Sequence, residues 1–188
     1  LLYQPDANFS GSDTLTLTLH DNSQAGSGGD KTATSTITVT VGGGNNAPVF
    51  SGLDATPTLI EDGAAVILDS NATVSDVELS AYNNWGAAVL TIARQGGANA
   101  EDVFGWTGSG SLGVNASSSS VRIATTSVGT FTSTGGRLTI TFANTTTTAQ
   151  VNTVLQGITY SNSNNNPPAS VVLAFTINDA NDPSNLTK

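Results

Sequence analysis

Hydroxyl and apolar side chains alternate along two segments near the start of the chain. Residues 14–19 alternate Thr with Leu, and residues 34–41 alternate Thr with Ser, Ile and Val. A period of two places the apolar side chains on one face of a strand, so both segments predict half-buried β-strands. Residues 21–31 are rich in Gly, Ser and Asn. They indicate a connecting loop, and residues 14–41 therefore predict a long β-hairpin.

Residues 42–48 (GGGNNAP) interrupt this alternation and indicate a linker. Shorter apolar segments follow, separated by turn-rich stretches, which is the pattern of a β-sandwich. We predict strands near residues 49–53, 65–68, 88–93, 121–125, 138–142, 158–161 and 171–177. One helix is predicted over residues 149–155, because its apolar residues fall at i, i+3 and i+4; Thr148 is its expected N-cap and Gly157 its expected end.

These patterns predict an all-β fold: an antiparallel β-sandwich with one short helix, preceded by a β-hairpin from an upstream module. An internal repeat supports two modules, since residues 15–22 (LTLTLHDN) resemble residues 173–180 (LAFTINDA). Each copy is a strand that leads into a loop with an Asp. We expect the chain to be part of a longer protein. The expected organisation is residues 1–41 for the closing strands of the upstream module, 42–48 for the linker, and 49–188 for a larger sandwich that lacks its last strand.

The composition excludes several kinds of chemistry. The 188 residues contain no Cys and one His, and 5 Lys and Arg stand against 14 Asp and Glu, a formal charge of −9. Thiolate metal sites, disulfides and cysteine nucleophiles are therefore excluded, and the chain lacks the basic footprint of a nucleic-acid-binding protein. No run of 18 apolar residues predicts a membrane span. A Ser-His-Asp triad would need His20, which is out of phase with the neighbouring Leu residues, so we expect no enzyme.

Four segments resemble a known family. They are residues 3–14, with the Asp21 loop and Thr/Val strand after them, the linker residues 45–50 (NNAPVF), residues 74–79 (VSDVEL) and residues 97–104 (GANAEDVF). Together they resemble bacterial cadherin-like (Ig-like) repeats of large RTX-type surface adhesins. The resemblance implies a non-enzymatic, calcium-rigidified extender segment of a bacterial adhesin, secreted or at the cell surface. Its implied partners are the neighbouring repeats of the same long chain.

Strand direction predicts which acidic side chains meet. Successive strands of an antiparallel sandwich reverse direction, so the acids before the first hairpin strand and two loops of the second module should face the linker. Carboxylate, amide and carbonyl oxygens are the ligands that calcium prefers, and we predict a Ca²⁺ site at this junction. Its expected ligands are Asp6, Asp13, Asn45, Asn46, Asp76, Glu78, Asp179 and Asn181. The resemblance places Glu61 at the next junction. The alternative for all of these is a solvated loop acid.

Two further hypotheses concern partners. Trp85 and Trp106 suggest a glycan- or peptide-binding module, the alternative being that each packs in the core or anchors a loop. A lone two-stranded hairpin is marginal in water, and the strand at 171–177 would leave an unpaired edge. We therefore predict that strand 32–41 pairs beside 171–177, in the same chain or, preferably, by exchange between copies.

Overall fold

The computed structural model describes residues 2–6, 9, 11–22, 27–107 and 112–180. The chain divides into two compact units, Leu1–Asn45 and Asn46–Lys188. The boundary between them falls within the segment predicted as the linker. The two units are described separately below, as unit 1 and unit 2.

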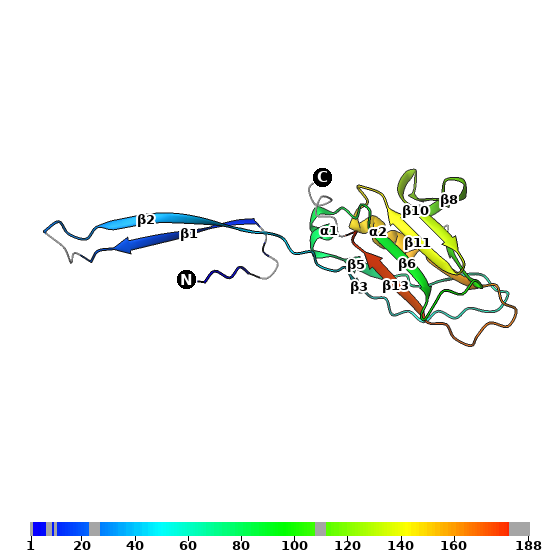
Figure 1. Ribbon diagram of the computed structural model, residues 1–188. Coiled ribbons are helices and arrows are strands. Elements are labelled where there is room, and N and C mark those ends of the chain that lie inside the picture. Colours follow the sequence, from blue (N-terminus) through cyan, green and yellow to red (C-terminus); the bar gives the residue numbers. More distant parts are fainter. Residues whose placement is uncertain (1, 7–8, 10, 23–26, 108–111, 181–188) are drawn as a thin grey trace. The chain divides into compact units, whose positions relative to one another are not determined.

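Unit 1 contains the predicted hairpin. Strands β1 (Gly11–His20) and β2 (Thr32–Val41) pair antiparallel along their full length, with Leu15 opposite Ile37 (Figure 1). Among the described residues no third strand joins this sheet. Its apolar side chains consequently remain accessible, and Leu19 is 74% exposed.

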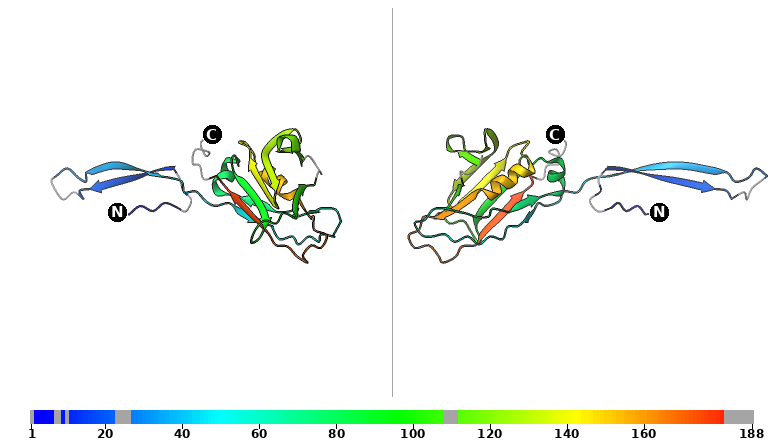
Figure 2. Two further views of the ribbon diagram at one scale, coloured as in Figure 1. Left: turned by 45° about the vertical axis from the view of Figure 1, so that its right-hand side comes forward. Right: turned by 180° about the vertical axis from the view of Figure 1, so that it is seen from behind.

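Unit 2 is built from antiparallel sheets. The largest has the order β13-β6-β11-β10-β9-β8, a second has the order β4-β12-β7, and β3 pairs with β5 (Figures 1 and 2). The strands are β3 (Val49–Ser51), β4 (Val66–Ile67), β5 (Thr73–Ser75), β6 (Val89–Arg94), β7 (Asp102–Trp106), β8 (Leu112–Asn115), β9 (Ser120–Ile123), β10 (Thr126–Thr134), β11 (Arg137–Phe142), β12 (Ile158–Asn162) and β13 (Leu173–Asn178). The coarse prediction of an antiparallel, mostly β fold is confirmed.

Alternation along the strands builds the core of unit 2. On β11, Leu138, Ile140 and Phe142 are buried, and on β6 so are Leu90 and Ile92. These side chains pack with the buried residues of strand β12 and of helix α2 in one apolar cluster. The period-two pattern thus identified the core-facing side of the central strands.

The described residues contain two α-helices where one was predicted. Helix α2 (Thr148–Gln156) matches the prediction, but its N-cap is Thr147 and not Thr148, because Thr147 and Gln150 form a reciprocal capping box. Gly157 ends it, as predicted. The second helix, α1 (Val77–Tyr82), was missed because one and a half turns are too short to show an apolar period. A single 3₁₀ turn covers Ala116–Ser118.

The sequence pattern also missed strands β5, β7, β8 and β10. Strand β10 shows why, since its register with β9 shifts between Ser127 and Gly129. A bulge of this kind breaks the alternation of faces on which the prediction depended. Within the described residues, no helix is both long and apolar enough to cross a membrane.

Strand β13 lies at the end of the six-stranded sheet. It pairs with β6, and β2 pairs with β1, so each of β13 and β2 has one strand partner in the described part of the chain. The predicted pairing of residues 32–41 with 171–177, in the same chain or between copies, stays a prediction.

Candidate functional site

Asp76 begins helix α1 at one end of unit 2. Its carboxylate Oδ1 accepts hydrogen bonds from the backbone N–H groups of Glu78 (2.9 Å) and Leu79 (2.7 Å), which makes it the N-cap. The loop predicted at this position is thus a capped helix start. The other oxygen, Oδ2, is buried and has no hydrogen-bond partner among the described residues. One face of this carboxylate is therefore left without compensation.

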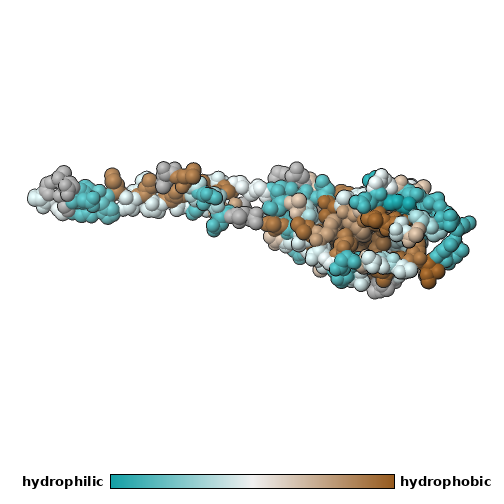
Figure 3. All heavy atoms as spheres, turned by 90° about the horizontal axis from the view of Figure 1, so that it is seen from below, coloured by the Kyte–Doolittle hydropathy of each residue, from teal (hydrophilic) through white to brown (hydrophobic). Residues whose placement is uncertain are grey.

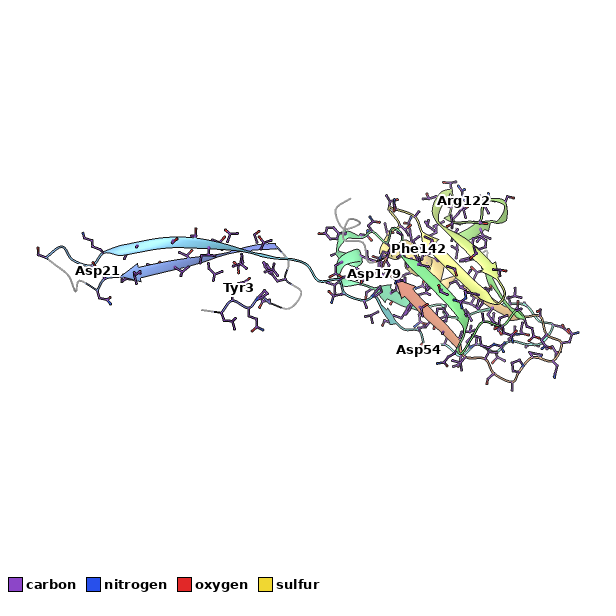
Figure 4. The ribbon with its side chains drawn as sticks, in the orientation of Figure 1. Tyr3, Asp21, Asp54, Arg122, Phe142 and Asp179 are labelled. Carbon is purple, nitrogen blue, oxygen red and sulfur yellow. The ribbon has the colours of Figure 1, made fainter. Side chains whose placement is uncertain are left out.

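Three other predicted ligands lie around Asp76. Glu78 is in the first turn of α1, and its Oε2 accepts a hydrogen bond from the Asn46 backbone N–H at 3.1 Å. Asp179 follows β13 directly and is 9% exposed. Figure 4 shows Asp179 at the end of β13 that lies beside α1. The structure thus brings Asn46, Asp76, Glu78 and Asp179 together, and we call these four residues the acidic cluster.

The electrostatics of the acidic cluster are repulsive. Burial raises the pKa of Asp76, and the charges of Glu78 and Asp179 raise it further, against the lowering effect of the two capping N–H groups. No Lys or Arg forms an ion pair with Asp76 or Glu78 in the part of the chain described here. A buried carboxylate with a raised pKa and two acidic neighbours favours uptake of either a proton or a cation.

The remaining predicted ligands are distributed as follows. Asp6 and Asp13 belong to unit 1, where Asp13 accepts a hydrogen bond from the Tyr3 hydroxyl at 3.0 Å. Desolvation, this hydrogen bond and the charges of Asp13 and Asp6 raise the pKa of Tyr3. Asn45 is the last residue of unit 1, and Asn181 lies outside the described residues.

Glu61 is exposed, in a turn closed by the Gly63 N–H bond to the Ile60 carbonyl. That turn lies at the end of unit 2 away from α1 (Figure 1). Glu61 is therefore separate from the acidic cluster.

Within the described residues, no three His, Asp or Glu side chains stand ready-placed to enclose a metal ion. The acidic cluster nevertheless offers the hard oxygen donors that calcium takes, and calcium accepts amide and main-chain oxygens as well. The orphaned Oδ2 of Asp76 is the feature that fits a cation best, because it is buried, negatively charged and unpartnered.

The two tryptophans have different environments. Trp85 is fully buried, and its indole N–H donates to the Thr148 hydroxyl at 3.0 Å. Trp106 is half-buried and packs edge-on against Phe131, with ring centroids 5.7 Å apart. A stacking surface formed by both rings is therefore ruled out, since Trp85 offers no accessible face.

Sequence reasoning missed a second buried carboxylate, Asp102 on β7. It accepts two hydrogen bonds from Arg94 at 2.6 and 3.0 Å, one from the Tyr160 hydroxyl at 2.8 Å and one from the Asn162 amide at 3.0 Å. Burial alone would raise the pKa of Asp102, but Arg94 and its other donors lower it. Because all its oxygens are satisfied, Asp102 is a structural group rather than a ligand site.

A third carboxylate, Asp69, is also buried and was also missed. Its Oδ2 accepts from the backbone N–H groups of Asp54 and Ala55, and its Oδ1 from those of Asn71 and Ala72, all between 2.8 and 3.1 Å. Burial opposes the charged form, yet the four donors outweigh it and lower the pKa of Asp69. Asp69 thus holds the irregular segment after β3 against the turn before β5.

We expect Asp69→Asn to lower the free energy of unfolding by about 2 kcal/mol at pH 7, because the amide nitrogen cannot accept from the N–H groups on its side. A group with a lowered folded pKa stabilises above its unfolded pKa, about 3.9, and loses that contribution as the pH falls through the folded value. The difference between wild type and variant should therefore shrink at pH 3, which urea titrations at both pH values measure. A difference that is equal at pH 7 and pH 3 would contradict this role.

Comparison of the chain with family models, curated proteins and solved structures finds no match.

Proposed function

We propose that the chain is a non-enzymatic, calcium-rigidified extender segment of a bacterial cell-surface adhesin, with a cadherin-like repeat as unit 2. The observation that carries the proposal is the buried, unpartnered Oδ2 of Asp76 between Glu78 and Asp179. The antiparallel sandwich and the residue 45–50 pattern support the assignment of the repeat.

The energetic argument rests on desolvation. An ionised carboxylate removed from water without a compensating partner is costly, and the ionised form of Asp76 would have such an oxygen in its buried Oδ2. A calcium ion supplies the missing charge and accepts oxygens in irregular geometry. The Asp76, Glu78 and Asp179 carboxylates would hold it, and Asn46 supplies a main-chain carbonyl and an amide close to Glu78.

The mechanical consequence follows from where these groups lie in the chain. Asn46 is the first residue of unit 2, Asp76 and Glu78 open α1, and Asp179 follows the last described strand. An ion held by all of them would link three places in the sequence of unit 2: its first residue, the start of α1, and the residue after β13. Tying these three places together stiffens the unit against extension.

Calorimetry of the full chain tests the proposal. We expect added Ca²⁺ to raise the melting temperature relative to chelator, with a stabilisation of about 2.7 kcal/mol at a concentration of 100 times Kd. Asp76→Asn should abolish the response to calcium while folding normally, because the Asn side chain still caps α1. In chelator the variant should be at least as stable as wild type, since the buried charge is gone.

The pH dependence in chelator has a definite sign. A carboxyl with a folded pKa above its unfolded value of about 3.9 loses stability as the pH rises from that value through the folded pKa. Wild type should show this loss at Asp76, and Asp76→Asn should lack it. Asp62→Asn is the matched control, because Asp62 is an exposed turn acid that does not belong to the acidic cluster. Equal melting temperatures with calcium and with chelator would overturn the calcium proposal.

A further inference from the structure

Strand β13 has a free edge whose hydrogen-bonding groups can be identified. The Gln95 N–H donates to the Val172 carbonyl at 2.8 Å, and this pair continues the β6–β13 register. In an antiparallel ladder, residues alternate between bonding one neighbour and facing the other side. The backbone groups of Leu173, Phe175 and Ile177 therefore point away from β6, toward an edge that no described strand occupies.

In unit 1, the corresponding edge of β1 is occupied by a strand, β2. There the Asp21 N–H donates to the Lys31 carbonyl at 3.1 Å, which continues the β1–β2 register. By the same alternation, Leu15, Leu17 and Leu19 direct their backbone groups at β2. The internal repeat aligns these three leucines with Leu173, Phe175 and Ile177. The free edge of β13 is thus the counterpart of the edge by which β1 holds β2.

An apolar groove runs beside this edge. It has a volume of about 560 Å³, and its lining includes Val171, Leu173 and Phe175 together with Leu53 and Leu59. The face of unit 2 that Figure 3 shows from below carries a broad patch of apolar atoms. A strand added to β13 would lay alternate side chains over this groove.

We propose that the free edge of β13 is a strand-acceptor site and that its occupant is strand β2 of a second copy of this chain. The strand lies antiparallel, with Ile37 opposite Leu173 and Ser35 opposite Phe175, as β2 lies on β1. Ile37 then covers the groove beside Leu173, and Val39 falls opposite Val171. The threonines of β2 remain on the solvent face with Thr176.

Transfer of β2 from its own hairpin to β13 of a second copy is favoured, because the hairpin gives β2 little stabilisation. In the hairpin Ile37 is 50% exposed, and a two-stranded sheet is marginally stable in water. On β13 the ladder is shorter, because β13 spans six residues where β1 pairs ten with β2, but it forms against a sheet of six strands. There Ile37 and Val39 lose their contact with water. The proposal is independent of calcium, since none of these residues belongs to the acidic cluster.

A disulfide cross-link tests the register, because the chain has no Cys. The probe is a peptide of residues 31–42 carrying Thr34→Cys, added to full-length Thr176→Cys. Thr176 is exposed, and the proposed pair 176–34 is a non-hydrogen-bonded one, whose Cα atoms lie about 4.5 Å apart. We expect a covalent adduct by mass spectrometry at least tenfold faster than with a Ser35→Cys peptide, whose thiol faces the groove. Equal rates for the two peptides would overturn the register.

Backbone methylation tests which edge of the peptide is used, on the unaltered chain. N-methyl groups at Ser35 and Ile37 block the edge that faces β13, and we expect binding measured by fluorescence anisotropy to be lost. N-methyl groups at Thr34 and Thr36 lie on the opposite edge and should leave it unchanged. Loss with the second peptide alone would mean that β2 adds by its other edge and would overturn the proposed pairing.

Sedimentation of the full chain tests the source of the strand. We expect a concentration-dependent dimer that excess unmethylated peptide converts to monomer. A chain that stays monomeric at every concentration while the peptide binds would show that another molecule supplies the strand, and would overturn the second copy as occupant.

Discussion

Replacing Asp102 by Ala is expected to lower the free energy of unfolding by about 3–5 kcal/mol, the usual cost of removing one partner of a buried ion pair. The loss is large because Arg94, the Tyr160 hydroxyl and the Asn162 amide all lose their acceptor together. Arg94 stands on β6 of the six-stranded sheet, while Asp102 and Tyr160 stand on β7 and β12 of the three-stranded sheet. The carboxylate therefore joins the two sheets across the core. Urea denaturation of the full chain, followed by tryptophan fluorescence, measures the effect.

Glu101→Gln is the matched control for Asp102→Ala. Glu101 is the preceding residue and accepts a hydrogen bond from the Asn164 amide, which Gln can still accept. Its substitution should change stability by less than about 0.5 kcal/mol. If Asp102→Ala were as mild as this control, Arg94 and Tyr160 would have to find water in place of the carboxylate, and the two sheets would not depend on it.

Replacing Trp85 by Ala is expected to cost about 3–5 kcal/mol, the range for truncating a large core aromatic. Trp85 is fully buried, and its backbone N–H bonds the Thr146 carbonyl while its indole N–H bonds Thr148 at the start of α2. Truncation therefore creates a cavity and removes a tie to that helix. Denaturation followed by circular dichroism measures the loss, because the variant lacks one of the two tryptophans.

Trp85→Phe separates the two contributions, since Phe fills most of the space and lacks the N–H group. We expect it to retain much of the stability lost in Trp85→Ala. Equal losses in the two variants would contradict the cavity argument. A loss below about 1 kcal/mol for Trp85→Ala would place the ring outside the core.

Local pattern was sufficient for much of the fold. The hairpin, the central strands β6 and β11 and helix α2 were predicted because period two or 3.6 is strict there and the buried face is continuous. Strand β10 was not predictable, since its bulge at Ser127–Gly129 shifts the faces. Helix α1 begins at a single capping side chain, that of Asp76. An Asp without an apolar helical pattern after it does not predict the start of a helix.

The site was predictable only in part, for a related reason. Strand direction grouped Asp76, Glu78 and Asp179, which the structure places near one another, because topology alone decides which loops share an end of a sandwich. It could not identify the buried Asp69 and Asp102, whose roles depend on donors 2 to 60 residues away in sequence. A carboxylate bound by four backbone N–H groups leaves no trace in the pattern of its own neighbours.

The register of the hairpin has a mechanical consequence. Gly11 and Val41, the first residue of β1 and the last of β2, lie directly opposite each other. Tension carried along the chain would enter at one and leave at the other, and so would pull the two strands apart at their paired ends. The backbone hydrogen bonds between β1 and β2 would break one after another, starting at the Gly11–Val41 pair. They would not be loaded all at once, as they are in shear. At about 3.3 Å per residue, full opening of residues 11–41 would release about 100 Å of chain at low force. Under tension, unit 1 would therefore extend before a stiffer unit 2 does.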